Sequence, residues 1–230
     1  MALWDHVQST GVDSGSGTSA SLSFSTNITA GNILIVIARF GEVSQNPGCS
    51  DDKGNTYVRI ESVEEPTNTD TLTLWYALAA AAGATQVTIT NASSTTRRWI
   101  IAEYDAASTT IAADQHTGTI GDSITPDSGN VTTTSASELL VSAGHSSNGR
   151  TFTAGTGYTK RQEIATKVAL EDKSVSSTGT YSGSWTLSAQ DLWAASIVTF
   201  SSTAGGGRTT KNTRAFPLGT EIGMNWRGAA

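Results

Sequence analysis

The sequence predicts an all-β protein, a jelly-roll-like antiparallel β-sandwich of roughly a dozen strands with an extended C-terminal arm. Composition is the first reason: the chain has 230 residues, 23 of them glycine, and only 15% are charged. Patterning is the second, because the apolar runs are short, rich in β-branched residues and separated by turn residues. The third is the lack of any long helical pattern between these runs, which favours a sandwich or barrel over a parallel sheet.

The segment 32–40, NILIVIARF, is the longest unbroken apolar run and is predicted to be a central strand. It lies between Gly31 and Gly41 and is rich in β-branched side chains, which pack well on a pleated surface. An apolar run without alternation is typical of a strand buried on both faces. A buried helical segment of this length is the alternative, since periodicity alone does not separate the two.

The first half of the chain contains further strand patterns around this segment. Strands are predicted at residues 3–8, 21–25, 57–63, 71–79, 86–90 and 97–104. In 71–79 the alternation places Leu72, Leu74 and Tyr76 on one face and Trp75 on the other. Gly/Ser/Thr-rich or polar stretches predict loops between them, at residues 10–20, 41–55, 64–70 and 91–96.

The second half is patterned less evenly. Residues 106–129 are predicted to be irregular, and strands follow at residues 131–134, 138–145, 167–175, 179–187 and 192–200. The strands 167–175 and 179–187 are predicted to pair as a hairpin because the link between them is short. No internal repeat of fixed period is visible in the sequence.

Residues 1–202 are predicted to form the sandwich domain and residues 203–230 a Gly-hinged assembly arm. The arm mixes basic and large apolar side chains, although the whole chain has a net charge of −6. This mixture predicts a segment that packs on another surface; a frayed terminus or a purification remnant is the alternative. The arm residues expected to make this contact are Arg208, Lys211, Arg214, Phe216, Leu218, Ile222, Met224, Trp226 and Arg227.

Charge and hydropathy exclude several classes of partner. A net charge of −6 provides no field that would collect nucleic acid or an anionic membrane. The longest apolar run is far below the roughly 20 residues that span a bilayer. The opening residues lack a basic segment followed by an apolar one, so no signal peptide is predicted. The single cysteine, Cys49, excludes an internal disulfide.

The sequence contains no convincing catalytic constellation. The Asp-Ser-Gly triplets that begin at Asp13 and Asp127 match only part of a serine-protease motif and are interpreted as turns. Cys49 is followed by two aspartates, which would disfavour a thiolate. Glu103 and Asp105 share a strand face and keep a glycan hydrolase open as a hypothesis.

Two groups of residues are candidates for binding. The hard oxygen ligands of Asp51, Asp52 and Asn55 would suit calcium, although the same residues are typical of a turn, and no other cofactor is predicted. Trp75, Tyr57 and Tyr158 are candidate platforms for stacking a glycan ring. The three histidines are too far apart in sequence to predict a zinc site.

Several segments together resemble a β-sandwich module that recurs in bacteriophage virion structural proteins and bacterial surface proteins. These are DDKGNTY at 51–57, LTLWYALAAAAGATQVTIT at 72–90, IIAEYDA at 100–106, ALEDKSVSSTGTYSGSWTL at 169–187 and DLWAASIVTF at 191–200. The resemblance covers residues 31–200. It implies a non-catalytic module that decorates heads, forms fibres or binds glycans, and no functional residue is transferred by it.

These observations predict a non-enzymatic virion structural protein, a head decoration, fibre or tail component, assembled in the host cytoplasm. We expect it to form homo-oligomers or to dock on another virion protein through its C-terminal arm. A surface glycan is the further partner considered, whereas nucleic acid and membrane are not expected. A carbohydrate-binding module and a glycan hydrolase are the alternatives.

Overall fold

The computed structural model describes residues 4–106 and 110–203. In these two ranges there is no helix, and fifteen strands account for the regular structure, which confirms the all-β prediction. The strands are β1 (Trp4–Ser23), β2 (Ile33–Phe40), β3 (Gly48–Asp51), β4 (Val58–Glu65), β5 (Asp70–Ala77), β6 (Gln86–Ala106), β7 (Thr110–Ser123), β8 (Val131–Thr132), β9 (Glu138–Ser146), β10 (Phe152–Ala154), β11 (Thr159–Ile164), β12 (Val168–Val175), β13 (Thr180–Tyr181), β14 (Trp185–Leu187) and β15 (Asp191–Thr203).

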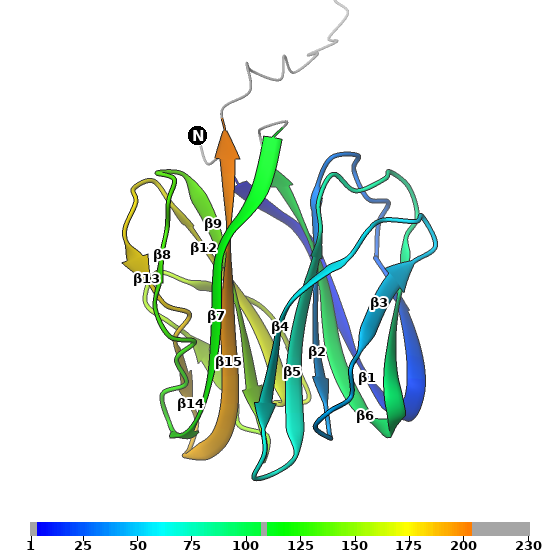
Figure 1. The fold of residues 1–230 in the computed structure, drawn as a ribbon, viewed down its shortest axis with the longest axis vertical. Coiled ribbons are helices and arrows are strands. Elements are labelled where there is room, and N and C mark those ends of the chain that lie inside the picture. Colours follow the sequence, from blue (N-terminus) through cyan, green and yellow to red (C-terminus); the bar gives the residue numbers. More distant parts are fainter. Residues whose placement is uncertain (1–3, 107–109, 204–230) are drawn as a thin grey trace, which may run out of the picture.

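Two antiparallel sheets pack face to face as a sandwich (Figure 1). The first sheet has the order β1-β6-β2-β5-β4, with β3 also paired to β6. The second sheet has the order β11-β12-β9-β15-β7. Two small two-stranded sheets, β10-β14 and β8-β13, complete the described structure.

The main core lies between the two sheets and follows strand alternation. Ile33, Ile35 and Ile37 of β2 pack there against side chains such as Leu139 and Val141 of β9. All eight residues of β2 are buried, which confirms the predicted central strand and rules out the helical alternative. The predicted alternation of 71–79 is also confirmed, since Leu72 and Leu74 face this core and Trp75 faces away from it.

The outer faces of both sheets are covered as well. On the first sheet, Val87 and Ile89 from the beginning of β6 pack with Trp75 and Trp99 in a second apolar cluster. On the second sheet, the β10-β14 pair contributes Phe152, Trp185 and Leu187 to a third cluster. Burial on both faces explains why the central strands have continuous apolar runs instead of alternating ones.

Five sequence-based expectations are wrong. The predicted loop at 41–55 contains β3. The predicted loop at 10–20 lies within β1, the predicted turn at 91–96 lies within β6, and the irregular segment 106–129 contains β7. The predicted hairpin of 167–175 with 179–187 does not form, because β12 pairs with β9 and β11. For β1, β6 and β7 a main-chain ladder to a distant strand forms where the Ser-, Thr- and Gly-rich side-chain pattern carries no signal.

The two halves of the chain have the same topology. The five principal strands are β1, β2, β4, β5 and β6 in the first half and β7, β9, β11, β12 and β15 in the second. In both sheets their spatial order is first, fifth, second, fourth, third. The third principal strand of each half, β4 or β11, also has a β-bulge at the same place relative to its neighbour. The bulge lies between Arg59 and Glu61 in β4 and between Lys160 and Gln162 in β11.

The ladder registers allow the halves to be matched residue by residue. Ile33 pairs with Tyr104 in the first sheet, and Leu139 pairs with Phe200 in the second, so these positions correspond. Leu72 and Val168 correspond in the same way, but at a different separation in sequence. The repeat therefore has no fixed period, because the connecting segments differ in length, and this is why the sequence did not reveal it.

Candidate functional site

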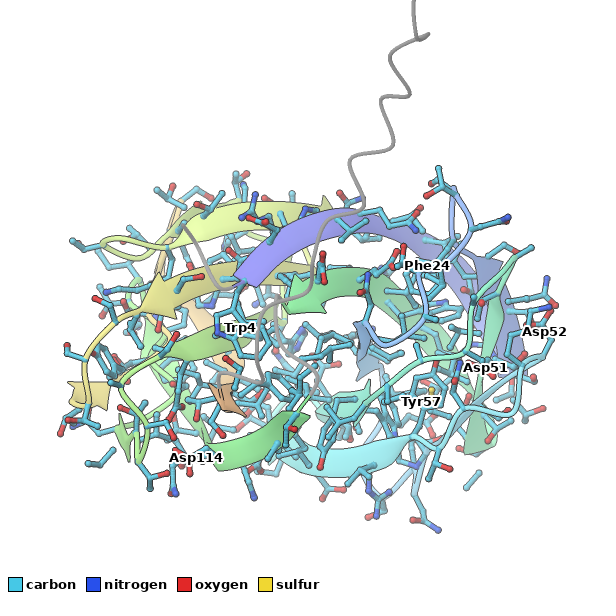
Figure 2. The ribbon with its side chains drawn as sticks, turned by 90° about the horizontal axis from the view of Figure 1, so that it is seen from above. Trp4, Phe24, Asp51, Asp52, Tyr57 and Asp114 are labelled. Carbon is cyan, nitrogen blue, oxygen red and sulfur yellow. The ribbon has the colours of Figure 1, made fainter. Side chains whose placement is uncertain are left out.

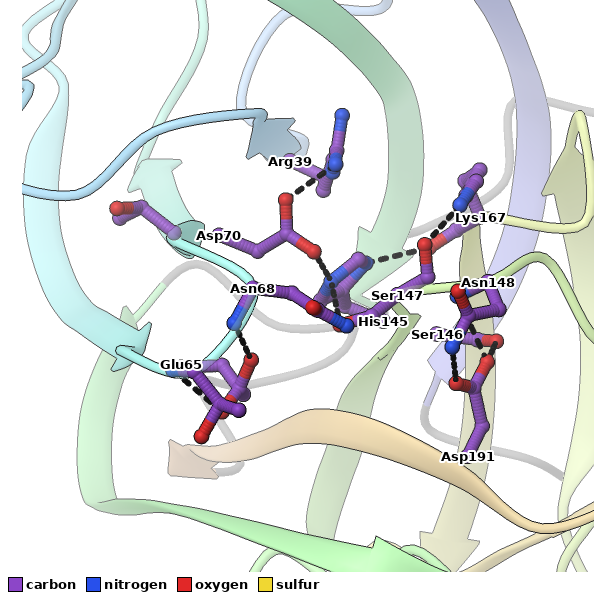
Figure 3. Close-up of polar contacts among 12 residues, drawn as sticks. Arg39, Glu65, Asn68, Asp70, His145, Ser146, Ser147, Asn148, Lys167 and Asp191 are labelled. Carbon is purple, nitrogen blue, oxygen red and sulfur yellow. Dashed lines mark hydrogen bonds and ion pairs between the residues drawn. The ribbon is translucent and has the colours of Figure 1, made fainter.

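A buried group of polar side chains lies between the sheets, where β2 and β9 end and β5 begins (Figure 3). We call it the Asp70 cluster: Arg39, Asp70, His145, Ser147 and Lys167. Arg39 follows Ile37 in the inward positions of β2, and His145 follows Ala143 in those of β9. Strand alternation thus directs a guanidinium and an imidazole into the same buried region.

Asp70 joins the two sheets through its two carboxylate oxygens. Its Oδ1 accepts a hydrogen bond from Nη2 of Arg39, on the same sheet. Its Oδ2 lies 2.8 Å from Nε2 of His145, on the other sheet, and the two side chains are 1% and 0% exposed. Burial disfavours the ionised carboxyl, but the hydrogen bond and charge of His145 and the charge of Arg39 outweigh it, so the pKa of Asp70 is lowered.

The remaining contacts decide what this cluster can do. His145 Nδ1 lies 2.8 Å from the main-chain oxygen of Lys167, which only accepts, so Nδ1 carries a proton. Ser147 Oγ lies 3.4 Å from Nε2, the same nitrogen that faces Asp70. A hydrolytic triad needs the serine and the acid on opposite ring nitrogens. The geometry is that of a structural tie between the sheets.

A second buried carboxylate, Asp191, lies beside this cluster. It accepts hydrogen bonds from Oγ of Ser146 and from the main-chain nitrogen and Nδ2 of Asn148, the last two at 2.9 and 2.6 Å. Burial raises the pKa of Asp191, but the hydrogen bonds from Ser146 and Asn148 lower it by more, so its pKa lies below the ordinary value. Asp191 therefore holds the segment that leaves β9 against the beginning of β15.

The candidate calcium ligands Asp51 and Asp52 lie near Tyr57 (Figure 2). Asp51 Oδ1 accepts from the main-chain nitrogens of Lys53 and Asn55, and its Oδ2 accepts from Asn55 Nδ2 and Tyr57 Oη, at 2.7 to 3.1 Å. Asp52 Oδ1 accepts from the main-chain nitrogen of Gln86 at 2.9 Å. In the described part of the chain no group of three or more His, Cys, Asp or Glu side chains is placed to hold a metal. The geometry supports the turn interpretation, and calcium stays a prediction.

The candidate glycan platforms are not free aromatic faces. Trp75 is 2% exposed and lies in the outer cluster of the first sheet, so its expected stacking role is wrong. Tyr57 is half-buried, with its hydroxyl on Asp51. Tyr158 is half-buried too; its hydroxyl donates to the main-chain oxygen of Ser182, and Lys173 Nζ lies 5.4 Å from the ring centroid. All three aromatic side chains are therefore in contact with other residues of the same chain.

Glu103, one of the two acids of the hydrolase hypothesis, is also engaged. It is fully buried and accepts hydrogen bonds from Gln8 Nε2, the main-chain nitrogen of Thr29 and Asn32 Nδ2, at 2.6 to 2.9 Å. These bonds fix the segment between β1 and β2. The predicted arm residues, from Arg208 to Arg227, lie outside the described residues.

Glu171 of β12 is a buried acid that the sequence did not predict as a site, because Glu171 and its neighbour Asp172 face opposite sides of a strand. It lies on the outer face of the second sheet, at the position that corresponds to Trp75 in the first. Its Oε2 accepts a hydrogen bond from the main-chain nitrogen of Gly155 at 3.0 Å. Burial raises its pKa to about 8, since that bond and the others it makes do not compensate for desolvation. The sequence signal for this buried acid is its place directly after the apolar residues Val168, Ala169 and Leu170 of the same strand.

Comparison with known proteins gives no relative. No family model, no curated protein and no solved structure matches the chain. Among the residues that the structure describes there is also no helix of the length and apolar character needed to cross a bilayer.

Proposed function

We propose that this chain is a non-enzymatic structural protein of a virion, a preformed block that joins copies of itself or a shell protein through residues 203–230. The finer class is a head decoration, fibre or tail component. The sequence resemblance of residues 31–200 to modules of that kind supports this class.

The observation that carries the proposal is the tie between the sheets through Asp70. Its carboxylate is satisfied only when Arg39 and His145 meet it together, one from each sheet. Separating the sheets would break the contact between Asp70 and His145 and leave the carboxylate with Arg39 alone. Such a sandwich resists deformation, as a building block of a particle must.

A second observation supports the same reading. Asp70, Asp191 and Glu103 are buried acids, and each is held by several hydrogen bonds from its own chain. These acids therefore stabilise the fold. The mixture of basic and apolar residues after Thr203 supplies a segment suited to a partner surface.

Light scattering tests the proposal on two proteins, the full chain and a chain that ends at Ser202. We expect the full chain to form oligomers as its concentration rises and the truncated chain to stay a monomer of unchanged fold. Monomers in both cases, across micromolar to millimolar concentrations, would remove the assembly role of the arm. Circular dichroism of the truncated chain is the control for folding.

A further inference from the structure

The contact between the two halves of the chain has the character of a subunit interface. Every strand of the first sheet comes from residues 4–106, and every strand of the second comes from residues 110–203. The two small sheets also stay within the second half. In the described residues no main-chain ladder joins the halves, so they meet through side chains.

The composition of this contact matches that of a dimer interface, an apolar centre with a polar periphery. Residues of the inner faces form one apolar cluster, in which Tyr76 and Phe200 meet edge to face at 5.3 Å between ring centroids. Two pairs of a histidine and an acid lie beside it. His145 meets Asp70 at 2.8 Å, and His116 meets Glu61 at the edge between β7 and β4.

The contact is also reciprocal, as two-fold symmetry requires. Gly11 of β1 packs on Ile164 of β11, and Gly118 of β7 packs on Val63 of β4, so closely that a Cβ on either glycine would overlap the facing side chain. Gly11 and Gly118 occupy corresponding positions in the two halves. Gly11 pairs with Ile100 in the first sheet, and Gly118 pairs with Ser196, the residue that corresponds to Ile100, in the second. The registers likewise match Val63 with Ile164, which lie opposite Leu72 and Val168.

An exchange of this kind, in which residue i meets j and j meets i, defines an isologous interface. The Asp70 cluster lies on the same pseudo-axis, because Arg39 and His145 occupy corresponding positions of β2 and β9. The two edge contacts and the positions of Arg39 and His145 therefore obey one two-fold relation.

We propose that residues 4–106 and 110–203 are two copies of one strand unit that recognise each other as the subunits of a two-fold dimer do. The partner that fits the inner face of each sheet is the complementary half of the same chain. The covalent connection through residues 107–109 is not needed to hold the halves together. This inference is independent of the proposed virion role.

The test uses the full chain with a site-specific protease sequence in place of residues 107–109. After cleavage we expect the two fragments to elute together, with the mass of the uncleaved protein and an unchanged circular dichroism spectrum. The midpoint of thermal unfolding then rises with protein concentration, because two molecules combine. Separation or precipitation of the fragments, while the uncleaved insertion protein stays folded, overturns the proposal.

A matched pair of variants locates the association surface on the cleaved protein. Gly118→Val should weaken the association of the fragments about tenfold or more, because the added side chain collides with Val63. Ile120→Val, at a 44% exposed position of the same strand, should leave it within about twofold. Equal affinities for the two variants would show that the reciprocal contact is not the association surface, and the proposal would fail.

Discussion

At the residue scale, one acid breaks the two-fold relation between the halves. Arg39 and His145 correspond, yet both turn to Asp70, whose matching position in the second half is Thr166. A single carboxylate thus contacts two buried basic side chains, one from each sheet. The pairing makes Asp70 the residue on which the joining of the sheets depends most.

Replacing Asp70 by asparagine tests this dependence. The variant keeps the volume but leaves Arg39 and His145 buried without their anion, so we expect it to lose about 3–5 kcal/mol of unfolding free energy. The control is Asp13→Asn, whose carboxylate is 39% exposed and pairs with Arg98; its loss should stay below about 1 kcal/mol. Urea unfolding measures both, and similar losses would contradict the role of Asp70.

The pH dependence of Asp70 follows from its lowered pKa. Because the folded state holds the carboxylate more strongly than the unfolded chain does, this stabilisation is present above the ordinary pKa of 3.8. It disappears as the pH falls through the lower folded pKa. The acid limb of the stability curve should therefore be shallower in Asp70→Asn than in the unmodified protein.

Glu171 gives the opposite dependence. Its folded pKa of about 8 lies above the ordinary 4.5, so the folded state binds the proton more tightly. Stability is complete below the ordinary value and falls as the pH rises toward 8, by up to about 1.4 kcal/mol per pH unit. Unfolding at pH 5, 6.5 and 8 should show this slope, and Glu171→Gln should remove most of it. An identical slope in both proteins would show that Glu171 ionises freely in the fold.

At the element scale, the sequence predicts the strands that carry apolar side chains. β2, β5, β9 and β15 stand out because burial on one or both faces demands apolar runs. β7 and the middle of β1 are invisible to such reasoning, because they are edge strands of the two main sheets, rich in Ser, Thr and Gly and held by ladders to distant strands. The candidate site shows the same division: Arg39 interrupts an apolar run, but only the folded chain reveals that His145 and Asp70 meet it.

The two close edge contacts give a prediction for β1 and β7 together. Gly11→Val and Gly118→Val should destabilise the chain by similar amounts, about 1–3 kcal/mol each, because both crowd a corresponding side chain on the other sheet. Ser19→Val, at an exposed position of β1, controls for the general effect of a branched residue in a strand. A large loss in only one of the two glycine variants would contradict their equivalence.

At the scale of the whole molecule, the fold is a pair of matched units whose chain ends also match. Trp4 pairs with Ala106 at the end of the first sheet, and Thr110 pairs with Thr203 at the end of the second. Figure 1 places all these ends at one end of the sandwich. The step from Ala106 to Thr110 therefore corresponds, under the two-fold relation, to the step from Thr203 back to Trp4.

The most direct measurement of this equivalence is the stability of a circular permutant. A three-residue linker would join Thr203 to Trp4, and the new ends would open at residues 107–109. Two equivalent halves predict amide NMR shifts like those of the parent away from the new ends, and a Tm within about 5 °C of it. A permutant that fails to fold, or that loses far more than this, would contradict the account.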